Sequence, residues 1–267
     1  MLECVINVSE GRDTGLVSRL AESVSGEPTR QLLDIHSDAD HNRSVFTLVG
    51  IDAPRALTRR CIELLDISDH SGVHPRLGVV DVVPFVALDG SSRRDALTAR
   101  NDFASWAADE LRLPVFLYGP ERTLPDIRRD AWTTLLPDHG PNVAHPTAGA
   151  VCVGVRPVLI AYNVLLASSD LTLAKGVATR VRRPGLRTLA FMVGGAAQVS
   201  MNIVDADEIS VSAAYDAVAA EAAALGIRVV KAELVGLLTE RHLLMNDEIR
   251  WAQLDIGPDR TVESRLR

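Results

Sequence analysis

The stretch "ISDHSGVHPRLGVVD", residues 67–81, places two imidazoles and a guanidinium directly before an apolar run. His70 and His74 flank a Ser-Gly pair, and Pro75 and Arg76 follow His74. Because the pKa of imidazole lies near neutral pH, a histidine in a partly dry site can both accept and donate a proton. Glycine lets the backbone turn and proline stiffens it, so the stretch can aim one side chain from a strand end. These residues predict acid–base chemistry.

A metal site is the alternative interpretation of the same residues. His70 and His74 are four apart, which is the spacing of a zinc-binding pair on a helix. However, Gly72 and Pro75 disfavour a helix there, and no Glu follows the first histidine. We therefore expect a site without a bound metal.

Polar residues gather in three further loops. In "INVSEGRD" (residues 6–13) a strand leads into the start of a helix. The backbone N–H groups there can bind an anion, or a side chain can simply cap them. "DIHSDADHNRS" (residues 34–44) is longer than a tight turn needs, which favours binding. In "DHGPNVAHPTAG" (residues 138–149) two prolines and several small residues can present backbone groups to a ligand.

Composition limits the class of protein. The chain has 267 residues, a net charge of −7 and an isoelectric point near 5.5, which argues against general nucleic-acid binding. No apolar window is long enough to span a membrane, and "MLECVINVSE" lacks the cationic start of a signal peptide. The three cysteines are scattered, so neither a disulfide framework nor a thiolate metal site is expected. We expect a reduced, cytoplasmic protein.

Hydrophobic periodicity predicts a β-α-β-β-α-β order at the start of the chain. The expected elements are Val5–Val8, Leu16–Val24, Gln31–Ile35, Val45–Val49, Asp52–Leu65 and Leu77–Leu88. A helix over Arg94–Leu111, a strand over Pro114–Tyr118 and a helix over Pro125–Leu135 should follow.

The same order returns after residue 150. Its expected elements are Val151–Leu166, Leu171–Val181, Leu186–Val193, Gln198–Val204, Val211–Leu225 and Ile227–Val230, with a closing helix over Thr239–Arg250 and a mobile end. The pattern predicts an α+β fold of two ferredoxin-like βαββαβ subdomains. Each should be a mostly antiparallel sheet with helices packed on one face, with a cleft or tunnel between them.

Six motifs in chain order carry a resemblance to a known family. They are "ECVINVSEG", "LLDIHSDADHNRSVFTLVG", "HSGVHPRLGVVDVVPF", "VFLYG", "GPNVAHPTAG" and "AQVSMNIVD". Together they closely resemble the formiminotransferase domain of the formiminotransferase-cyclodeaminase family, without the cyclodeaminase domain. The resemblance runs from Leu2 to about Leu237.

The resemblance implies a glutamate formimidoyltransferase, in which a formimino group passes from N-formimino-L-glutamate to tetrahydrofolate. It also implies subdomains at residues 1–157 and 158–267, a homodimer, a role in histidine degradation and one-carbon metabolism, and tetrahydrofolate as co-substrate. No metal, nucleic-acid or membrane partner is expected.

The resemblance also implies particular site residues. The histidine of the His-Pro-Arg triplet, the family's acid–base catalyst, is His74 here. The folate-contacting segment corresponds to Gly140, Pro141, Asn142, Val143, Ala144, His145, Pro146, Thr147, Ala148 and Gly149. Further candidate substrate contacts are Asn7, Glu10, His36, Asn42, Arg43 and Arg76. Among these, arginines suit carboxylate substrates, although Arg76 could instead form a structural salt bridge.

Three departures from the family pattern bear on substrate choice. His36 replaces an expected acidic residue, Ala148 replaces a bulky aromatic, and the link between Gly119 and Thr123 is short. Two other classes therefore stay open. One is a hydrolase or deiminase acting on a formimino or amidine substrate, and the other is a non-catalytic small-molecule-binding module.

Overall fold

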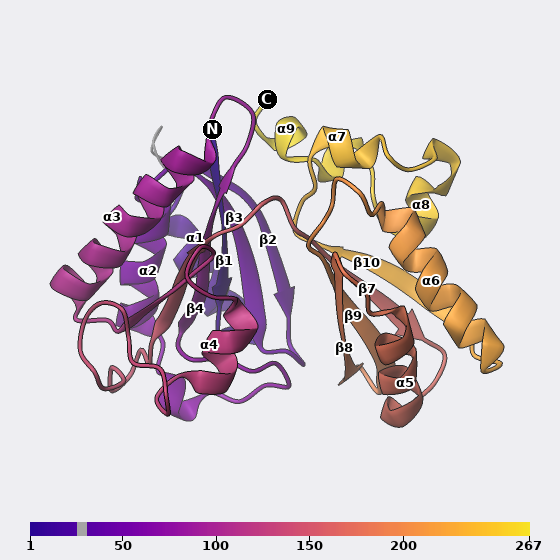
Figure 1. The fold of residues 1–267 in the computed structure, drawn as a ribbon, viewed down its shortest axis with the longest axis horizontal. Coiled ribbons are helices and arrows are strands. Elements are labelled where there is room, and N and C mark those ends of the chain that lie inside the picture. Colours follow the sequence, from indigo (N-terminus) through magenta and orange to yellow (C-terminus); the bar gives the residue numbers. More distant parts are fainter. Residues whose placement is uncertain (26–30) are drawn as a thin grey trace. The chain divides into compact units, whose positions relative to one another are not determined.

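The computed structural model describes residues 1–25 and 31–267, which divide into two compact units. Unit 1 comprises Met1–Arg156, and unit 2 comprises Pro157–Arg267. Each unit has its own sheet and its own hydrophobic core (Figure 1).

Unit 1 begins with a ferredoxin-like β-α-β-β-α-β motif whose four strands pair in the order β2-β3-β1-β4, all antiparallel. Its elements are β1 (Leu2–Val8), α1 (Thr14–Glu22), β2 (Gln31–Asp38), β3 (Arg43–Val49), α2 (Asp52–Leu64), the 3₁₀ turn η1 (Ile67–Asp69) and β4 (Val80–Ala87).

Two parallel strands extend this sheet beyond β4. After α3 (Arg93–Leu111), β5 (Val115–Tyr118) forms the far edge, and β6 (Val151–Val155) lies between β4 and β5. The expectation of one strand over Val151–Leu166 is therefore wrong. The apolar run continues across two strands of different sheets, and Pro157, which has no N–H to donate, lies in the link between them.

Alternation along the strands separates the two faces of the unit 1 sheet. Phe46 and Leu48 of β3 join the core under α1, α2 and α3, whereas Arg43 and Val45 lie on the opposite face. The helix α4 (Leu124–Asp130) packs on that opposite face, because its Ile127 joins a separate apolar cluster with residues of β4, β5 and β6. The predicted one-sided packing therefore holds for α1–α3 and not for α4.

Unit 2 is a ferredoxin-like motif with strand order β10-β7-β9-β8, antiparallel throughout. Its elements are β7 (Ile160–Leu166), α5 (Leu171–Val181), β8 (Leu186–Val193), β9 (Ala196–Ile203), α6 (Val211–Ala224) and β10 (Val229–Val235). Both helices join one core on one face of the sheet. The prediction of two α+β subdomains with mostly antiparallel sheets is confirmed, and the cleft between them stays a prediction.

The end of the chain packs within unit 2 as a series of short turns, and not as the expected single helix and mobile end. The turns are α7 (Glu240–Leu243), η2 (Glu248–Arg250), α8 (Trp251–Leu254), η3 (Pro258–Arg260) and α9 (Val262–Arg265). Val262 is buried, and its N–H donates to the carbonyl of Leu238 at 2.9 Å.

Two glycines let the loop before β4 lie directly against the segment before β6. The N–H of Val79 donates to the carbonyl of Ala148 at 3.0 Å, and the N–H of Ala150 donates to that of Leu77 at 3.0 Å. A Cβ on Gly78 would lie 2.3 Å from the Ala150 carbonyl oxygen. On Gly149, where φ is +72°, a Cβ would lie 2.2 Å from the Leu77 carbonyl oxygen. Only glycine fits these positions without moving backbone.

We predict that Gly78→Ala lowers the free energy of unfolding by roughly 2 kcal/mol or more, because the clash is with backbone atoms. Gly176→Ala is the matched control. It lies inside α5, where a Cβ meets only the end of the Arg180 side chain at 3.6 Å or more. This change should raise the free energy of unfolding by about 0.5–1 kcal/mol. Urea unfolding followed by circular dichroism measures both, and equal midpoints for the two variants would contradict the close-approach argument.

Candidate active site

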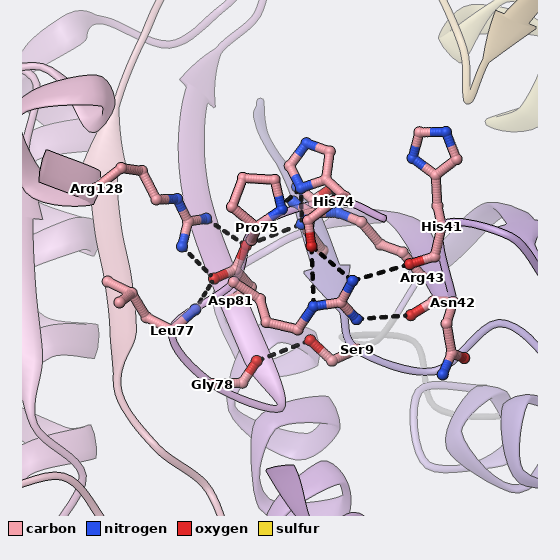
Figure 2. Close-up of polar contacts among 12 residues, drawn as sticks. Ser9, His41, Asn42, Arg43, His74, Pro75, Leu77, Gly78, Asp81 and Arg128 are labelled. Carbon is pink, nitrogen blue, oxygen red and sulfur yellow. Dashed lines mark hydrogen bonds and ion pairs between the residues drawn. The ribbon is translucent and has the colours of Figure 1, made fainter. Parts of the chain in front are cut away.

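His74 lies in the loop between η1 and β4, at the end of the unit 1 sheet where β2 turns into β3. The side chain is half-buried, and its ring centroid is 6.0 Å from that of His41 in the β2–β3 turn. Arg43, the first residue of β3, lies on the face of the sheet opposite α1–α3 and approaches the His74 ring (Figure 2). The loop over residues 34–44, which was predicted to bind a substrate, therefore meets the His74 loop.

A chain of charged side chains continues from His74 into the protein. Arg43 Nη1 lies 3.0 Å from His74 Nδ1 and donates to Asp81 Oδ2 at 2.9 Å. Asp81 is wholly buried on β4 and also accepts from both Nη atoms of Arg128 and from the Leu77 N–H at 2.8 Å. Burial alone would raise the pKa of Asp81, but the two arginines and these hydrogen bonds lower it below its usual value. Asp81 is therefore an anion that fixes two arginines.

The surroundings of His74 keep its ring neutral. Burial and then the Arg43 charge lower the pKa of His74 to about 3, with His41 adding to the effect, while the Pro75 carbonyl and Asp81 oppose it. A histidine with so low a pKa is unprotonated at neutral pH and can accept a proton. The low pKa also makes this ring a weaker base than an ordinary histidine.

The contacts of Nδ1 decide which ring nitrogen can react. Nδ1 lies 2.8 Å from the Pro75 carbonyl oxygen and 3.0 Å from Arg43 Nη1. In one neutral form Nδ1–H donates to Pro75, and in the other Nδ1 accepts from Arg43. The first form places the basic lone pair on Nε2, which is on the side of the ring away from Asp81 (Figure 2). This is the form that a general base at Nε2 requires.

Arg76 is fully occupied by the loops around it. Its Nε donates to the His74 carbonyl at 3.0 Å, and Nη2 donates to the carbonyls of His74 and His41 at 2.6 and 3.0 Å. Its Nη1 donates to the Asn42 carbonyl at 3.1 Å and lies 2.6 Å from His70 Nδ1. These contacts account for all five N–H donors of a guanidinium. Arg76 thus ties the His74 loop to the β2–β3 turn, and no donor is left over for a substrate carboxylate.

Gly72 makes this junction possible. A Cβ at this position would lie 2.3 Å from the His41 carbonyl oxygen and 2.5 Å from Arg76 Nη2. The glycine before His74 is therefore required by the close approach of the two loops rather than by a positive φ.

Asn7, Asn42 and Glu10, three other candidate substrate contacts, take part in the same framework. Asn7 Oδ1 accepts from Arg43 Nε at 2.9 Å. The Asn42 side chain is buried and bridges the Gly11 N–H and the Ser71 carbonyl, each at 3.0 Å. Glu10 Oε1 accepts from the N–H groups of residues 12 and 13 at 2.7 and 2.9 Å. Their role in substrate binding stays a prediction.

His36 lies on β2, opposite Val45 in the strand register. Because Asp38 is opposite Arg43 two residues away, His36 is on the same face of the sheet as Arg43. His36 is therefore on the side of the sheet that carries the candidate site.

The structure brings the predicted folate segment, Gly140–Gly149, against the His74 loop within unit 1. The Thr147 carbonyl accepts from the Ile67 N–H at 2.7 Å, and residues 148–150 pair with residues 77–79. His145 Nδ1 accepts from the Ala148 N–H at 3.0 Å and fixes the turn. Ala148 and Gly149 are buried, whereas residues 142–144 are exposed. We therefore expect any ligand contact from the exposed and half-buried residues of the segment, which include Thr147.

Asp81 and Arg128 were missed by the sequence reasoning. A carboxylate in the valine-rich run "GVVDVVPF" is a detectable signal, because an acid inside a buried strand needs partners. Arg128 offers no such signal, because it belongs to a helix 47 residues further along the chain. In residues 1–25 and 31–267 no cluster of three or more His, Cys, Asp or Glu could hold a metal, and the metal-free site stays a prediction. Within the same ranges no helix has the length and apolarity to cross a membrane.

Comparisons with known proteins give this arrangement a family. Residues 1–156 match the model of the formiminotransferase domain, N-terminal subdomain, and residues 161–253 match the model of the formiminotransferase domain. The chain is 33% identical to glutamate formimidoyltransferase of Thermoplasma acidophilum, over 91% of this chain and 90% of that one. It is 32% identical to glutamate formimidoyltransferase of Streptococcus pyogenes, over 91% of each. It is 34% identical to formimidoyltransferase-cyclodeaminase of Gallus gallus, over 91% of this chain but 51% of the relative. The chain therefore belongs to the formiminotransferase family.

Proposed function

We propose that this protein transfers the formimino group of N-formimino-L-glutamate to tetrahydrofolate, with His74 as general acid and base. One observation carries the proposal: a neutral imidazole, in contact with Arg43 and the Pro75 carbonyl, lies in a loop that pairs with the segment Gly140–Gly149. The names of relatives that this chain matches over nine-tenths of both lengths support the same reaction.

The reaction needs one proton to be moved twice. The N5 nitrogen of tetrahydrofolate attacks the formimino carbon, and a new C–N bond forms while the C=N pair moves to nitrogen. Nε2 of His74 takes the proton from N5 and then gives it to the glutamate nitrogen. The pair on the imino nitrogen then re-forms the C=N bond as the old C–N bond breaks and its electrons leave with the glutamate nitrogen, which yields 5-formiminotetrahydrofolate and glutamate. One imidazole can serve both transfers, because it is regenerated in its neutral form.

The other features expected from the resemblance belong to this proposal. We infer that tetrahydrofolate is the co-substrate, that the enzyme needs no metal, and that it acts in histidine degradation as a cytoplasmic homodimer. The segment Gly140–Gly149 favours the transferase over a hydrolase, because a hydrolase has no use for a folate site.

The two enzymatic alternatives differ in their products. Purified protein should release glutamate from formiminoglutamate only when tetrahydrofolate is present. Ammonia release without tetrahydrofolate would instead establish the hydrolase or deiminase, and the absence of both products would favour a binding module.

We predict that His74→Asn lowers turnover by roughly two to four orders of magnitude, because the amide cannot shuttle a proton. The change in KM should be small. His70→Asn is the control from the same loop, because His70 contacts Arg76. This change should lower turnover much less than His74→Asn does. Steady-state kinetics of both variants measure this. An essential His70 with a dispensable His74 would reverse the assignment.

We predict that Arg43→Gln moves the acidic limb of the kcat/KM profile to higher pH. Burial, the larger cause, still lowers the pKa of His74 from 6.5, but the nearest positive charge is gone, so its pKa rises above about 3. Because activity needs the neutral ring, it is then lost at a higher pH as acid is added. Arg60→Gln, at an exposed pair with Glu63, should leave the limb in place. An unshifted limb in Arg43→Gln argues against the pairing with His74.

We predict that Thr147→Glu weakens tetrahydrofolate binding by about tenfold or more, since an added carboxylate repels the anionic folate tail and crowds the segment. Anaerobic titration gives the affinity. Thr98→Glu, on the exposed side of α3, adds the same charge elsewhere in unit 1 and should have no effect. Equal affinities in the two variants would remove the segment from the folate site.

A further inference from the structure

Arg43, Asp81 and Arg128 form a buried cluster with more positive than negative charge. Their side chains are 11%, 0% and 17% exposed, respectively. Asp81 is the carboxylate to which both guanidinium groups donate. Buried charges in proteins are normally balanced by a partner, so a surplus cation in this position is unusual.

The hydrogen bonds of Arg43 and Arg128 leave some of their guanidinium N–H groups available to a ligand. Arg43 uses Nε on Asn7 and Nη1 on His74 and Asp81, while Arg128 places one bond from each Nη on Asp81. Arg43 Nη2 and Arg128 Nε donate to no residue among those that the structure describes. These donors belong to side chains that keep some exposure, so a small ligand can reach them.

Two other arginines of unit 1, one buried and one half-buried, are each balanced by one carboxylate. Arg100 is 5% exposed and meets Glu121, and Arg122 is 23% exposed and meets Asp138 in a two-point pair. In each case one guanidinium faces one carboxylate. Two guanidiniums that share one carboxylate therefore distinguish the neighbourhood of His74 from these two pairs.

We propose that Arg43 and Arg128, held in place by Asp81, form a subsite that binds a carboxylate group of a small-molecule substrate. This rests on the proposed function, in which the donor is a dicarboxylate. A planar guanidinium matches a carboxylate in shape and offers charge-assisted hydrogen bonds, so the bound anion completes the charge balance of the cluster. The subsite adds Arg128 and Asp81 to the residues that determine specificity, and Asp81 acts there as a positioning residue.

The bound carboxylate has a consequence for the neighbouring histidine. An anion beside Arg43 offsets the positive charge that lowers the pKa of His74, so the ring becomes a better base once the substrate is in place. The subsite thus links recognition of the donor to activation of the catalyst.

Glutarate tests the subsite without turnover. Isothermal titration at low salt should show that the full chain binds glutarate and not the uncharged glutaramide. Arg128→Gln should weaken glutarate binding by roughly tenfold to a hundredfold, the value of a charged hydrogen bond or pair. Arg129→Gln is the matched control, because Arg129 lies on the same helix but pairs with Asp126 and Asp130 at the surface. The control should bind glutarate as the unaltered protein does.

A second measurement applies if Arg128→Gln fails to fold. Glutarate, but not glutaramide, should slow the reaction of phenylglyoxal with Arg43 or Arg128 in the unaltered protein, read by peptide mass spectrometry. The proposal is overturned if Arg128→Gln binds glutarate normally, if neither arginine is protected, or if inorganic phosphate binds more tightly than glutarate. None of these readouts depends on formimino transfer, so a failure of the proposed reaction would be distinguishable.

Discussion

The wholly buried carboxylate of Asp81 is the constraint on which the candidate site depends. An acid inside a valine-rich strand is tolerated because two arginines and the Leu77 N–H surround it. Asp81 fixes the position of the Arg43 guanidinium, which contacts His74 Nδ1. Through its ion pair with Arg128, Asp81 also joins α4 to β4. Loss of one partner would leave an uncompensated buried charge, which typically costs 3–5 kcal/mol. Stability and the proposed catalysis therefore depend on one group.

The fold supplies the position of His74 by bringing backbones together. Arg76 closes the junction between the His74 loop and the β2–β3 turn through carbonyl groups, and Gly72 allows the approach. On the other side, Gly78 and Gly149 let the segment 140–149 pair with the strand entry. The loop that carries His74, the proposed catalytic residue, is thus held in a defined position, because hydrogen bonds fix its neighbours on both sides.

The sequence predicted the elements well where the hydrophobic period was unambiguous. The βαββαβ order of both units follows from alternation and helical spacing, but an apolar run cannot reveal that Val151–Val155 and Ile160–Leu166 belong to different sheets. The candidate catalytic role of His74 was predicted from the nearby Gly72 and Pro75 together with the family motif. The role of Arg76 was not, because carbonyl acceptors have no sequence signature. Arg128 could not be found either, since only the tertiary fold brings α4 to Asp81.

In the proposed site the Pro75 carbonyl accepts the proton held on His74 Nδ1, while burial and the Arg43 charge keep the ring neutral. Nitrogen-15 NMR of the histidine rings, assigned with the His74→Asn variant, measures this directly in the substrate-free protein. We predict a neutral His74 ring with a protonated Nδ1 at pH 7, which stays neutral on acidification well below pH 6.5. A ring that protonates near pH 6.5, or that carries its proton on Nε2 at pH 7, would contradict this arrangement.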